Sequence, residues 1–381
     1  MKIDQVKVYK VSLPFQMDIS HALTKTASAD NIVAEVIAEG GRIKGYGEGT
    51  PRTYVTGESQ QEAVENLSHL ILDNPFPWEP KEISDIWNFL DGLPDERRYN
   101  PAICALETAL LDAWGRDQKR NMIDFFPHDY RASQIDYGGA FPLGDNQKLN
   151  ERCLLMKKMK INKIKLKMGK YFDTNQEALE IVSRVFGDNY DLKIDVNGVW
   201  NTALALKHIP LLQKYRVNVV EQPMMPNDPA TAEFAEALKD SGIILMADES
   251  ACSFGDVQKI IKEGHYKMIN IRLSKLGGFR RSLKIIDVLR KENLFFQIGC
   301  HLGESGILSA AGRILSLLCK DSLYYDGSYD DLLLKQNITT ENISFGSGGK
   351  AGPLKGPGLG VTINEQSLNQ LTVDPIHVIK R

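Results

Sequence analysis

The chain has 381 residues, of which 43% are hydrophobic and 25% charged, and 46 basic against 49 acidic side chains give a net charge of −3. These values are typical of a globular protein and exclude a disordered, collagen-like or disulfide-rich chain. The mild acidity provides no basic face for nucleic acid, and no apolar run of about 18 residues predicts a membrane span. We therefore expect neither nucleic acid nor a membrane as a partner.

The cysteines and the first residues predict a cytoplasmic protein. The five cysteines are odd in number and widely spaced, which fits reduced thiols better than a disulfide framework or a zinc site. Residues 1–15 (MKIDQVKVYKVSLPF) alternate between apolar and polar instead of forming the apolar core of a signal peptide.

Residues 1–130 predict an α+β domain. Residues 3–12 and 31–38 alternate as half-buried strands do, and the glycines and proline of GYGEGTP (45–51) are typical of loops. From about residue 58 the pattern becomes helical, and LETALLDAWG (106–115) predicts an amphipathic helix that ends at its glycine.

Residues 131–345 predict a (β/α)₈-type barrel, with a doubly wound open sheet as the alternative. The prediction rests on β-rich runs that alternate with helical patterns. These runs are 135–143, 161–169, 191–200, 217–224, 242–250, 267–274, 294–302 and 322–328. The glycine-rich segment 346–381 is expected to return to the first domain. It contains neither GxGxxG before a helix nor GK[ST], so we expect no phosphate-bearing cofactor.

Charged side chains mark the C-terminal ends of most of these runs. Burying a charge in an apolar run is costly unless the charge faces a site, and barrel enzymes build their active sites at this edge. The residues are Lys165, Lys167, Asp195, Glu221, Asp248, Arg272, His301 and Asp326. A strand cap or a salt bridge explains any one of them, but the series favours an active site.

Three of these residues, Asp195, Glu221 and Asp248, are carboxylates on successive strands. Like charges that converge at one barrel mouth repel each other unless they share a cation. All-oxygen ligands select a hard dication, Mg²⁺ first and Mn²⁺ next. The alternative is that the three carboxylates pair with the basic side chains of the same edge and bind no metal ion.

Lys165 and Lys167 are two residues apart on a predicted strand and therefore point to the same face, which in a barrel is the interior. Two ammonium groups beside each other and beside a dication both lose affinity for protons, so a lysine in this position can act as a base near neutral pH. The alternative is a solvated lysine run, because residues 157–170 are rich in lysine.

Several motifs join these residues into a wider pattern. KLKMG (165–169), DVNGVW (195–200), EQP (221–223), ADES (247–250) and INIRLSKLGG (269–278) follow one another through the predicted barrel, and GYGEGTPRTYVTGES (45–59) and LETALLDAWG precede it. In order and spacing, the chain resembles the enolase superfamily over essentially its whole length. Within that superfamily it resembles the muconate lactonizing subgroup of the mandelate racemase and muconate lactonizing enzyme family, with its dipeptide epimerase relatives. The resemblance implies an α+β capping domain over a modified (β/α)₇β barrel.

Carried over position by position, the resemblance implies that the three carboxylates bind Mg²⁺. It also implies that Lys167 is the base on one face of the substrate, that Lys165 is its electrostatic neighbour, and that Asn197 lies close to the metal site.

Two positions depart from the subgroup. The sixth strand of the subgroup presents a second lysine, where this chain has Arg272, and arginine remains protonated and is a poor proton shuttle. His301 in GCHLGES is similar to the histidine of the mandelate racemase subgroup, but its usual aspartate partner on strand six is absent because Arg272 occupies that place. Either residue is a candidate to act on the second face of the substrate, and His301 without a catalytic role is the alternative.

The sequence thus predicts a Mg²⁺-dependent enzyme that abstracts the proton α to a carboxylate through an enediolate. An isomerase or cycloisomerase, similar to a muconate cycloisomerase, an epimerase or a racemase, is the first expectation. An acid dehydratase, a lyase that eliminates in the syn sense with one base, is the second. A degenerate barrel that retains only its metal site is the non-enzymatic alternative. We expect a small carboxylate-containing substrate and a homo-oligomer, because large barrels often associate.

Overall fold

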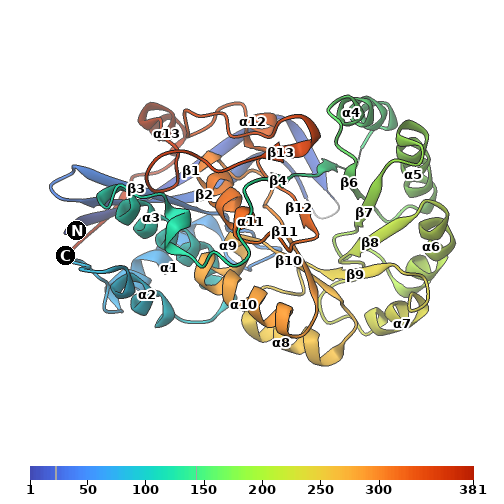
Figure 1. Cartoon of the computed structure of the whole chain (residues 1–381), viewed down its shortest axis with the longest axis horizontal. Helices are drawn as coiled ribbons and strands as arrows, with labels where there is room; N and C mark the ends of the chain where they lie inside the picture. Colours follow the sequence, from blue (N-terminus) through green and yellow to red (C-terminus); the bar gives the residue numbers. More distant parts are fainter. Residues whose placement is uncertain (22–23, 143) are drawn as a thin grey trace.

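The computed structural model describes residues 1–21, 24–142 and 144–381, and the side chains of these residues except those of 17–25. A four-stranded antiparallel sheet with its helices forms a cap at one end of the molecule, and an eight-stranded sheet ringed by helices forms the other end (Figure 1). Both termini lie on the cap, far from the barrel helices α5 and α6.

The cap sheet has the order β14-β1-β2-β3. Its strands are β1 (Ile3–His21), β2 (Thr24–Ala38), β3 (Ile43–Gly49) and β14 (His377–Lys380). Its helices are α1 (Gln60–Leu72), α2 (Ile83–Asp91) and α3 (Asn100–Asp117). A reciprocal capping box of Ser59 and Glu62 starts α1. Strand β14 pairs with β1, so the C-terminal segment ends on the cap sheet.

The glycines of GYGEGTP belong to a strand, so the loop expected at 45–51 is wrong for most of its length. Gly45, Gly47 and Gly49 alternate along β3 and face α3, where a Cβ on any of them would overlap the helix backbone. These three glycines therefore let α3 pack directly on the sheet, because a strand glycine allows another backbone to approach closely. Gly115 also does not end α3, which continues to Asp117; here the missing side chain makes room for Gly358 of the tail.

The barrel sheet is parallel and its strands follow chain order from β5 to β12, which excludes the open doubly wound alternative. The strands are β5 (Gly139–Phe141), β6 (Lys163–Lys167), β7 (Asp191–Asp195), β8 (Val217–Glu221), β9 (Ile244–Ala247), β10 (Met268–Ile271), β11 (Phe295–Ile298) and β12 (Tyr324–Tyr325). The N–H of Gly138 donates to the carbonyl of Tyr325 (2.9 Å) and joins the first strand to the last.

Seven helices of eight residues or more connect the eight strands, which gives the predicted (β/α)₇β pattern. They are α4 (Asn146–Lys158), α5 (Phe172–Phe186), α6 (Thr202–Lys214), α7 (Ala230–Ala237), α8 (Phe254–Glu263), α10 (Phe279–Lys291) and α11 (Gly306–Leu317). The shorter elements are η1 (Arg97–Tyr99), η2 (Met122–Phe125), β4 (Ile135–Asp136), α9 (Leu273–Leu276), α12 (Asp330–Leu333), η3 (Ser347–Gly349), β13 (Lys350–Ala351) and α13 (Glu365–Leu371).

Alternate residues of each barrel strand face the interior. Val219, Met246, Met268 and Tyr324, from four different strands, form a small apolar cluster there. Each lies two or four residues before a predicted site residue. The apolar cluster therefore lies in the barrel interior, directly below the charged residues of the C-terminal edge.

Two buried carboxylates of the cap bind the N-termini of barrel helices. Glu48 of β3 accepts hydrogen bonds from the N–H groups of Ser305 and Leu308 at the start of α11. Glu107 of α3 accepts hydrogen bonds from the N–H groups of Phe279 and Arg280 at the start of α10. Helix N-termini carry unpaired N–H groups and partial positive charge, so these carboxylates fasten the cap to the barrel.

Glu107→Ala is expected to destabilise the protein by about 2 kcal/mol, because two buried N–H groups of α10 lose their acceptor. The midpoint of urea unfolding measures the effect. Glu65→Ala removes an exposed carboxylate of α1 and is the control, with an expected change within about 0.5 kcal/mol. Equal midpoints for the two variants would show that Glu107 does not fasten the barrel.

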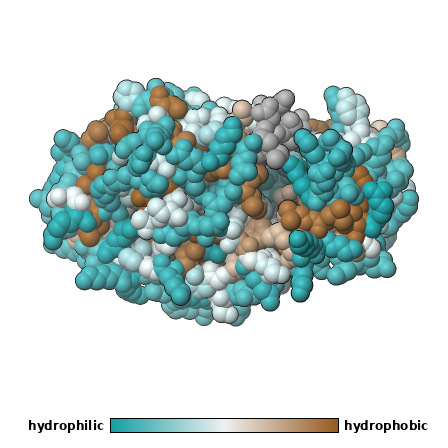
Figure 2. Space-filling model, turned by 90° about the horizontal axis from the view of Figure 1, so that it is seen from above, coloured by the Kyte–Doolittle hydropathy of each residue, from teal (hydrophilic) through white to brown (hydrophobic). Residues whose placement is uncertain are grey.

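The surface carries hydrophilic residues over most of the face seen from above, with apolar residues in separate patches (Figure 2). Within residues 1–21, 24–142 and 144–381, no helix has both the length and the apolar character needed to span a bilayer. All five cysteines are free thiols, in line with the expectation of reduced cysteines.

Candidate active site

The strand register brings the predicted site residues to one edge of the barrel. Lys167 of β6 lies beside Asp195 of β7, and Asp195 lies beside Glu221 of β8. Asp248 follows β9, and the loops or ends after β10, β11 and β12 carry Arg272, His301 and Asp326. All eight predicted strand-end residues are therefore at the C-terminal edge of the same barrel.

Arg272 lies across the barrel mouth from the two lysines. The strand order puts β10 four positions from β6 in a ring of eight. Lys165 and Lys167 therefore approach the mouth from one side and Arg272 approaches it from the opposite side. His301, one strand further on, lies next to Arg272 along the edge.

The first two predicted ligands are paired with nearby donors. Asp195 accepts a hydrogen bond from the N–H of Asn197 (3.2 Å) and lies 3.5 Å from Lys167 Nζ. Glu221 accepts one from Asn270 Nδ2 (2.6 Å) through Oε1, while its Oε2 lies 3.5 Å from Lys165 Nζ. Burial raises the pKa of Glu221, and the positive charge of Lys165 opposes that rise.

Asp248 has a cation on each oxygen. Its Oδ1 accepts a hydrogen bond from Lys275 Nζ (2.9 Å), and its Oδ2 forms an ion pair with the guanidinium of Arg272. Burial alone would raise the pKa of Asp248, but Arg272 and Lys275 outweigh it and hold the pKa well below its usual range. Arg272 also reaches Glu221 Oε1 at 3.5 Å, so it bridges two of the three carboxylates.

The three carboxylates thus pair with basic side chains, which is the arrangement that the metal-free alternative describes. Among the described residues, no three acidic, histidine or cysteine side chains gather as a ready-made metal cluster. The donor chemistry nevertheless fits a hard dication, because the buried oxygens Glu221 Oε2 and Glu249 Oε2 and the amide oxygen Asn270 Oδ1 lack a hydrogen-bond partner in the described chain. Carboxylate and amide oxygens are the ligands that Mg²⁺ accepts.

Lys165 is buried and bound to Asp326, whose Oδ2 lies 2.9 Å from its Nζ. Asp326 also accepts hydrogen bonds from the buried Lys193 of β7, which donates in addition to Gln297. Burial lowers the pKa of Lys165, but Asp326 and Glu221 outweigh burial and raise the pKa well above its usual value. The acidic residue of the eighth strand thus compensates the charge of Lys165.

Lys167 has a different environment. Its side chain is 24% exposed, and its Nζ donates to Asn197 Oδ1 at 2.9 Å. Asn197 Nδ2 donates in turn to Glu249 Oε1 at 3.0 Å, and Asn197 has a left-handed backbone with φ of 49°. Asparagine adopts this conformation more readily than most residues, and here it turns the amide between the lysine and the glutamate. Burial and the charges of Asp248 and Asp195 raise the pKa of Glu249 to about 8.

His301 is buried, and neither ring nitrogen has a hydrogen-bond partner among the described residues. Its Nδ1 lies 3.8 Å from Glu304 Oε1. Burial and the positive charges of Arg272 and Arg52 hold the pKa of His301 well below its usual value, so the imidazole is neutral at pH 7.

Sequence reasoning missed three residues of this site. Lys275 and Glu249 stand inside the quoted motifs INIRLSKLGG and ADES, and Lys193 lies two residues before Asp195. The alternation of strand side chains was the available signal for Lys193, since residue 193 must face the interior if residue 195 does. Nothing in the local pattern distinguishes Lys275 from a surface lysine.

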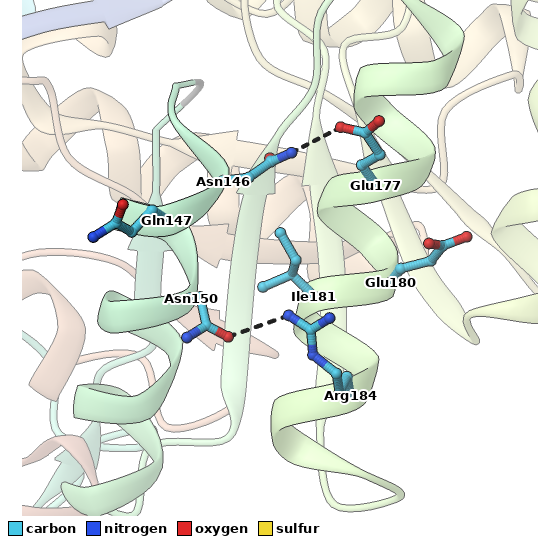
Figure 3. Close-up of a pocket in the computed structure, with 7 residues that line it drawn as sticks. All are labelled: Asn146, Gln147, Asn150, Glu177, Glu180, Ile181 and Arg184. Carbon is cyan, nitrogen blue, oxygen red and sulfur yellow. Dashed lines mark hydrogen bonds between the residues drawn. The ribbon is translucent and has the colours of Figure 1, made fainter.

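A cavity of about 450 Å³ lies elsewhere, between α4 and α5 on the outer surface (Figure 3). Its polar side chains bond across it, Asn146 to Glu177 (2.8 Å) and Arg184 to Asn150 (3.4 Å). None of the predicted site residues lines it, so it is a groove between surface helices that is separate from the barrel mouth.

The chain thus combines a cap domain with a (β/α)₇β barrel. The mouth of the barrel carries two lysines and three carboxylates, and Arg272 faces the lysines. These features together define a class of barrel enzymes. The family described as Enolase C-terminal domain-like matches residues 148–367. The chain belongs to this family, which confirms the resemblance to the enolase superfamily and the identification as an enzyme.

Relatives with known activities share most of the chain. It is 28% identical to a hydrophobic dipeptide epimerase of Enterococcus faecalis, over 82% of this chain and 86% of that protein. It is 24% identical to an N-succinyl-L-Arg/Lys racemase of Bacillus cereus over 98% of both chains. It is 25% identical to muconate cycloisomerase 1 of Rhodococcus opacus over 92% and 93% of the two chains. These activities support a reaction of the isomerase type.

Solved structures agree with the fold. The N-succinyl Arg/Lys racemase of Bacillus cereus matches with a TM-score of 0.89 at 24% identity over 100% of both chains. A dipeptide epimerase of Enterococcus faecalis, complexed with Mg and the dipeptide L-Leu-L-Tyr, matches with a TM-score of 0.82 at 24% identity. That match covers 95% of this chain and 100% of the other.

Proposed function

We propose that the protein catalyses a Mg²⁺-dependent isomerase-type reaction that begins with abstraction of the proton α to a substrate carboxylate. The observation that carries the proposal is the register of β6, β7 and β8, in which Lys167, Asp195 and Glu221 stand side by side at the barrel mouth. A base and a cation-binding carboxylate pair at one edge are the two components that enediolate formation requires.

Asp195, Glu221 and Asp248 would hold the Mg²⁺ ion. When bound, the ion supplies fixed positive charge near the substrate carboxylate, where negative charge develops as the proton leaves. The oxygen donors of these side chains support this assignment, as does Glu221 Oε2, which accepts no hydrogen bond from the described chain. The Mg-containing dipeptide epimerase among the similar structures supports the choice of metal.

Lys167 is the proposed base. It is the more exposed of the two site lysines, and its Nζ hydrogen-bonds the neutral amide of Asn197. The amide oxygen of Asn197 fixes the direction of the amine, and the Asp195 carboxylate lies 3.5 Å from the same nitrogen. The Glu249 carboxyl group accepts a hydrogen bond from the Asn197 amide nitrogen and so orients Lys167 through Asn197.

Lys165 is the proposed electrostatic partner of the enediolate. The raised pKa of Lys165 keeps it protonated, and its ion pair with Asp326 fixes its position below the mouth. A preorganised cation stabilises developing negative charge without any reorganisation at the moment of proton transfer.

Arg272 supports a reaction with one base. Its guanidinium remains protonated and faces the lysines across the mouth, where its planar set of donors suits a substrate carboxylate. With one base, the enediolate has two possible fates. It can rearrange and take the proton back on the same face, as in cycloisomerisation, or it can expel a leaving group from the β-carbon. Acid dehydration by syn elimination is therefore the second candidate function. His301 is the competing acid or base for the opposite face, and its low pKa weakens that assignment.

Deuterium exchange in D₂O with Mg²⁺ tests the proposal on dipeptides, N-acylamino acids, muconates and sugar acids. We expect exchange of the α-proton in one enantiomer only, because Lys167 serves one face and the protonated Arg272 cannot accept a proton near pH 7. His301→Asn is expected to leave this exchange within about threefold of the wild type, since the imidazole then has no part in the proton transfer.

Two results would contradict the proposal. Absence of Mg²⁺-dependent exchange from every acid in the panel would remove the proposed function. Exchange of both enantiomers by the wild type, with one lost in His301→Asn, would assign His301 as the second base and refute the one-base reaction.

A further inference from the structure

A second cavity, of about 290 Å³, lies between the cap and the loop that follows β11. Its apolar walls are Phe15, Ala29 and Leu302, and its polar wall includes Arg52, Tyr54 and Glu58. Leu302 directly follows His301, so the cavity borders the loop that carries His301. Tyr54 is 38% exposed at the edge of this cavity.

The positive charge beside this cavity is already bound within the protein. Arg52 donates to the carbonyls of Asp30 (2.9 Å) and Pro51 (2.7 Å) through one terminal nitrogen. Through the other it donates to Asn31 Oδ1 (2.9 Å) and the carbonyl of Leu302 (3.0 Å). The bond to Leu302 ties the cap to the barrel loop, and the four bonds together leave little donor capacity for an anionic ligand.

The negative charge beside the cavity is not bound in this way. Glu58 is only 2% exposed. Its Oε1 accepts a hydrogen bond from Thr56 Oγ1 (2.8 Å), whereas its Oε2 has no hydrogen-bond partner in the described part of the chain. A buried acceptor that lacks a donor is costly, and burial raises the pKa of Glu58 to about 7.

We propose that this cavity binds a cationic group, an ammonium or a guanidinium, at the far end of the substrate whose carboxylate lies at the barrel mouth. The inference rests on the proposed function for the position of that carboxylate. Glu58 supplies the charged acceptor, and the apolar walls suit a chain of methylene groups between the two ends of the substrate. The substrate class is therefore a carboxylic acid with a basic side chain, such as a lysyl or arginyl derivative.

Binding of matched probe pairs tests the inference by calorimetry at pH 8 with Mg²⁺ present. The pairs are L-Ala-L-Lys with L-Ala-L-norleucine, and Nα-acetyl-L-lysine with Nα-acetyl-L-norleucine. Norleucine has the same chain length as lysine and lacks only the ammonium group. We expect the wild type to bind at least one lysyl probe about tenfold more tightly than its norleucyl partner.

Glu58→Gln keeps the shape of the side chain and removes its charge, so the preference for lysine should fall to within about twofold. Glu65→Gln, which alters an exposed carboxylate nearby, should retain the full preference. A wild type without preference in either pair, or a Glu58→Gln variant that keeps the preference, would overturn the inference. Because binding is measured and not turnover, lysine-selective binding without α-proton exchange would refute the proposed function while supporting the cationic subsite.

Discussion

Lys167→Met is expected to lower α-proton exchange by about 10²–10⁴-fold, which is the range for loss of a positioned general base. Methionine has nearly the same length and keeps the packing of β6, but it cannot accept the proton. The amide of Asn197 loses its donor in this variant, while the three carboxylates and Lys165 remain. Exchange is measured by loss of the α-proton signal in D₂O with a substrate that the wild type turns over.

Lys170→Met is the matched control, because Lys170 lies three residues further on in the same lysine-rich run and is exposed. It should exchange at the wild-type rate. A Lys167→Arg variant separates charge from basicity, since arginine keeps the cation and accepts no proton near neutral pH. Exchange in Lys167→Met or Lys167→Arg at more than a tenth of the wild-type rate would remove Lys167 from the role of base.

Removal of divalent cations is expected to reduce turnover by about 10³-fold or more, because a bound metal ion contributes several kcal/mol of transition-state stabilisation. Treatment with a chelator followed by gel filtration gives the metal-free protein, and added Mg²⁺ should restore the activity. Mg²⁺ should also raise the melting temperature of the wild type, since a ligand that binds the folded state stabilises it.

Glu221→Gln provides the control for the metal site. Glu221 is the central carboxylate of the three, and its Oε2 accepts no hydrogen bond within the described chain, so its loss should abolish both the Mg²⁺-dependent stabilisation and the turnover. Full activity after removal of all divalent cations would contradict the metal assignment. The active form of the enzyme would then be the one in which the carboxylates pair with Lys165, Arg272 and Lys275.

The fold could be predicted largely from the sequence because the strand and helix patterns are local features of the chain. A strand and a helix together take about 25 residues, and the charged residue at each strand end repeats with that spacing. The predicted site residues met at one edge for the same reason, since parallel strands present their carboxyl ends together. Asp195, Glu221 and Lys167 needed no information beyond this rhythm.

Contacts between distant segments could not be predicted in the same way. The glycines of β3 were interpreted as a loop because their role depends on α3, more than 50 residues later. The ion pair of Lys165 with Asp326 joins the second strand to the eighth, and strand alternation does not reveal which side chains bond across the barrel. The same limit applies to Arg272, whose pairing with Asp248 and Glu221 depends on side-chain directions.

The attachment of the cap through Glu48 and Glu107 has a consequence for how substrate preference changes in such a molecule. The helices that these carboxylates hold follow β10 and β11, the strands that lead to Arg272 and His301. The cap therefore cannot tilt without pulling on the side of the mouth that faces the lysines. A cap joined in this way is held in one position relative to the barrel. A change of substrate preference is therefore expected from substitution of single side chains that face the mouth, and not from a movement of the whole cap.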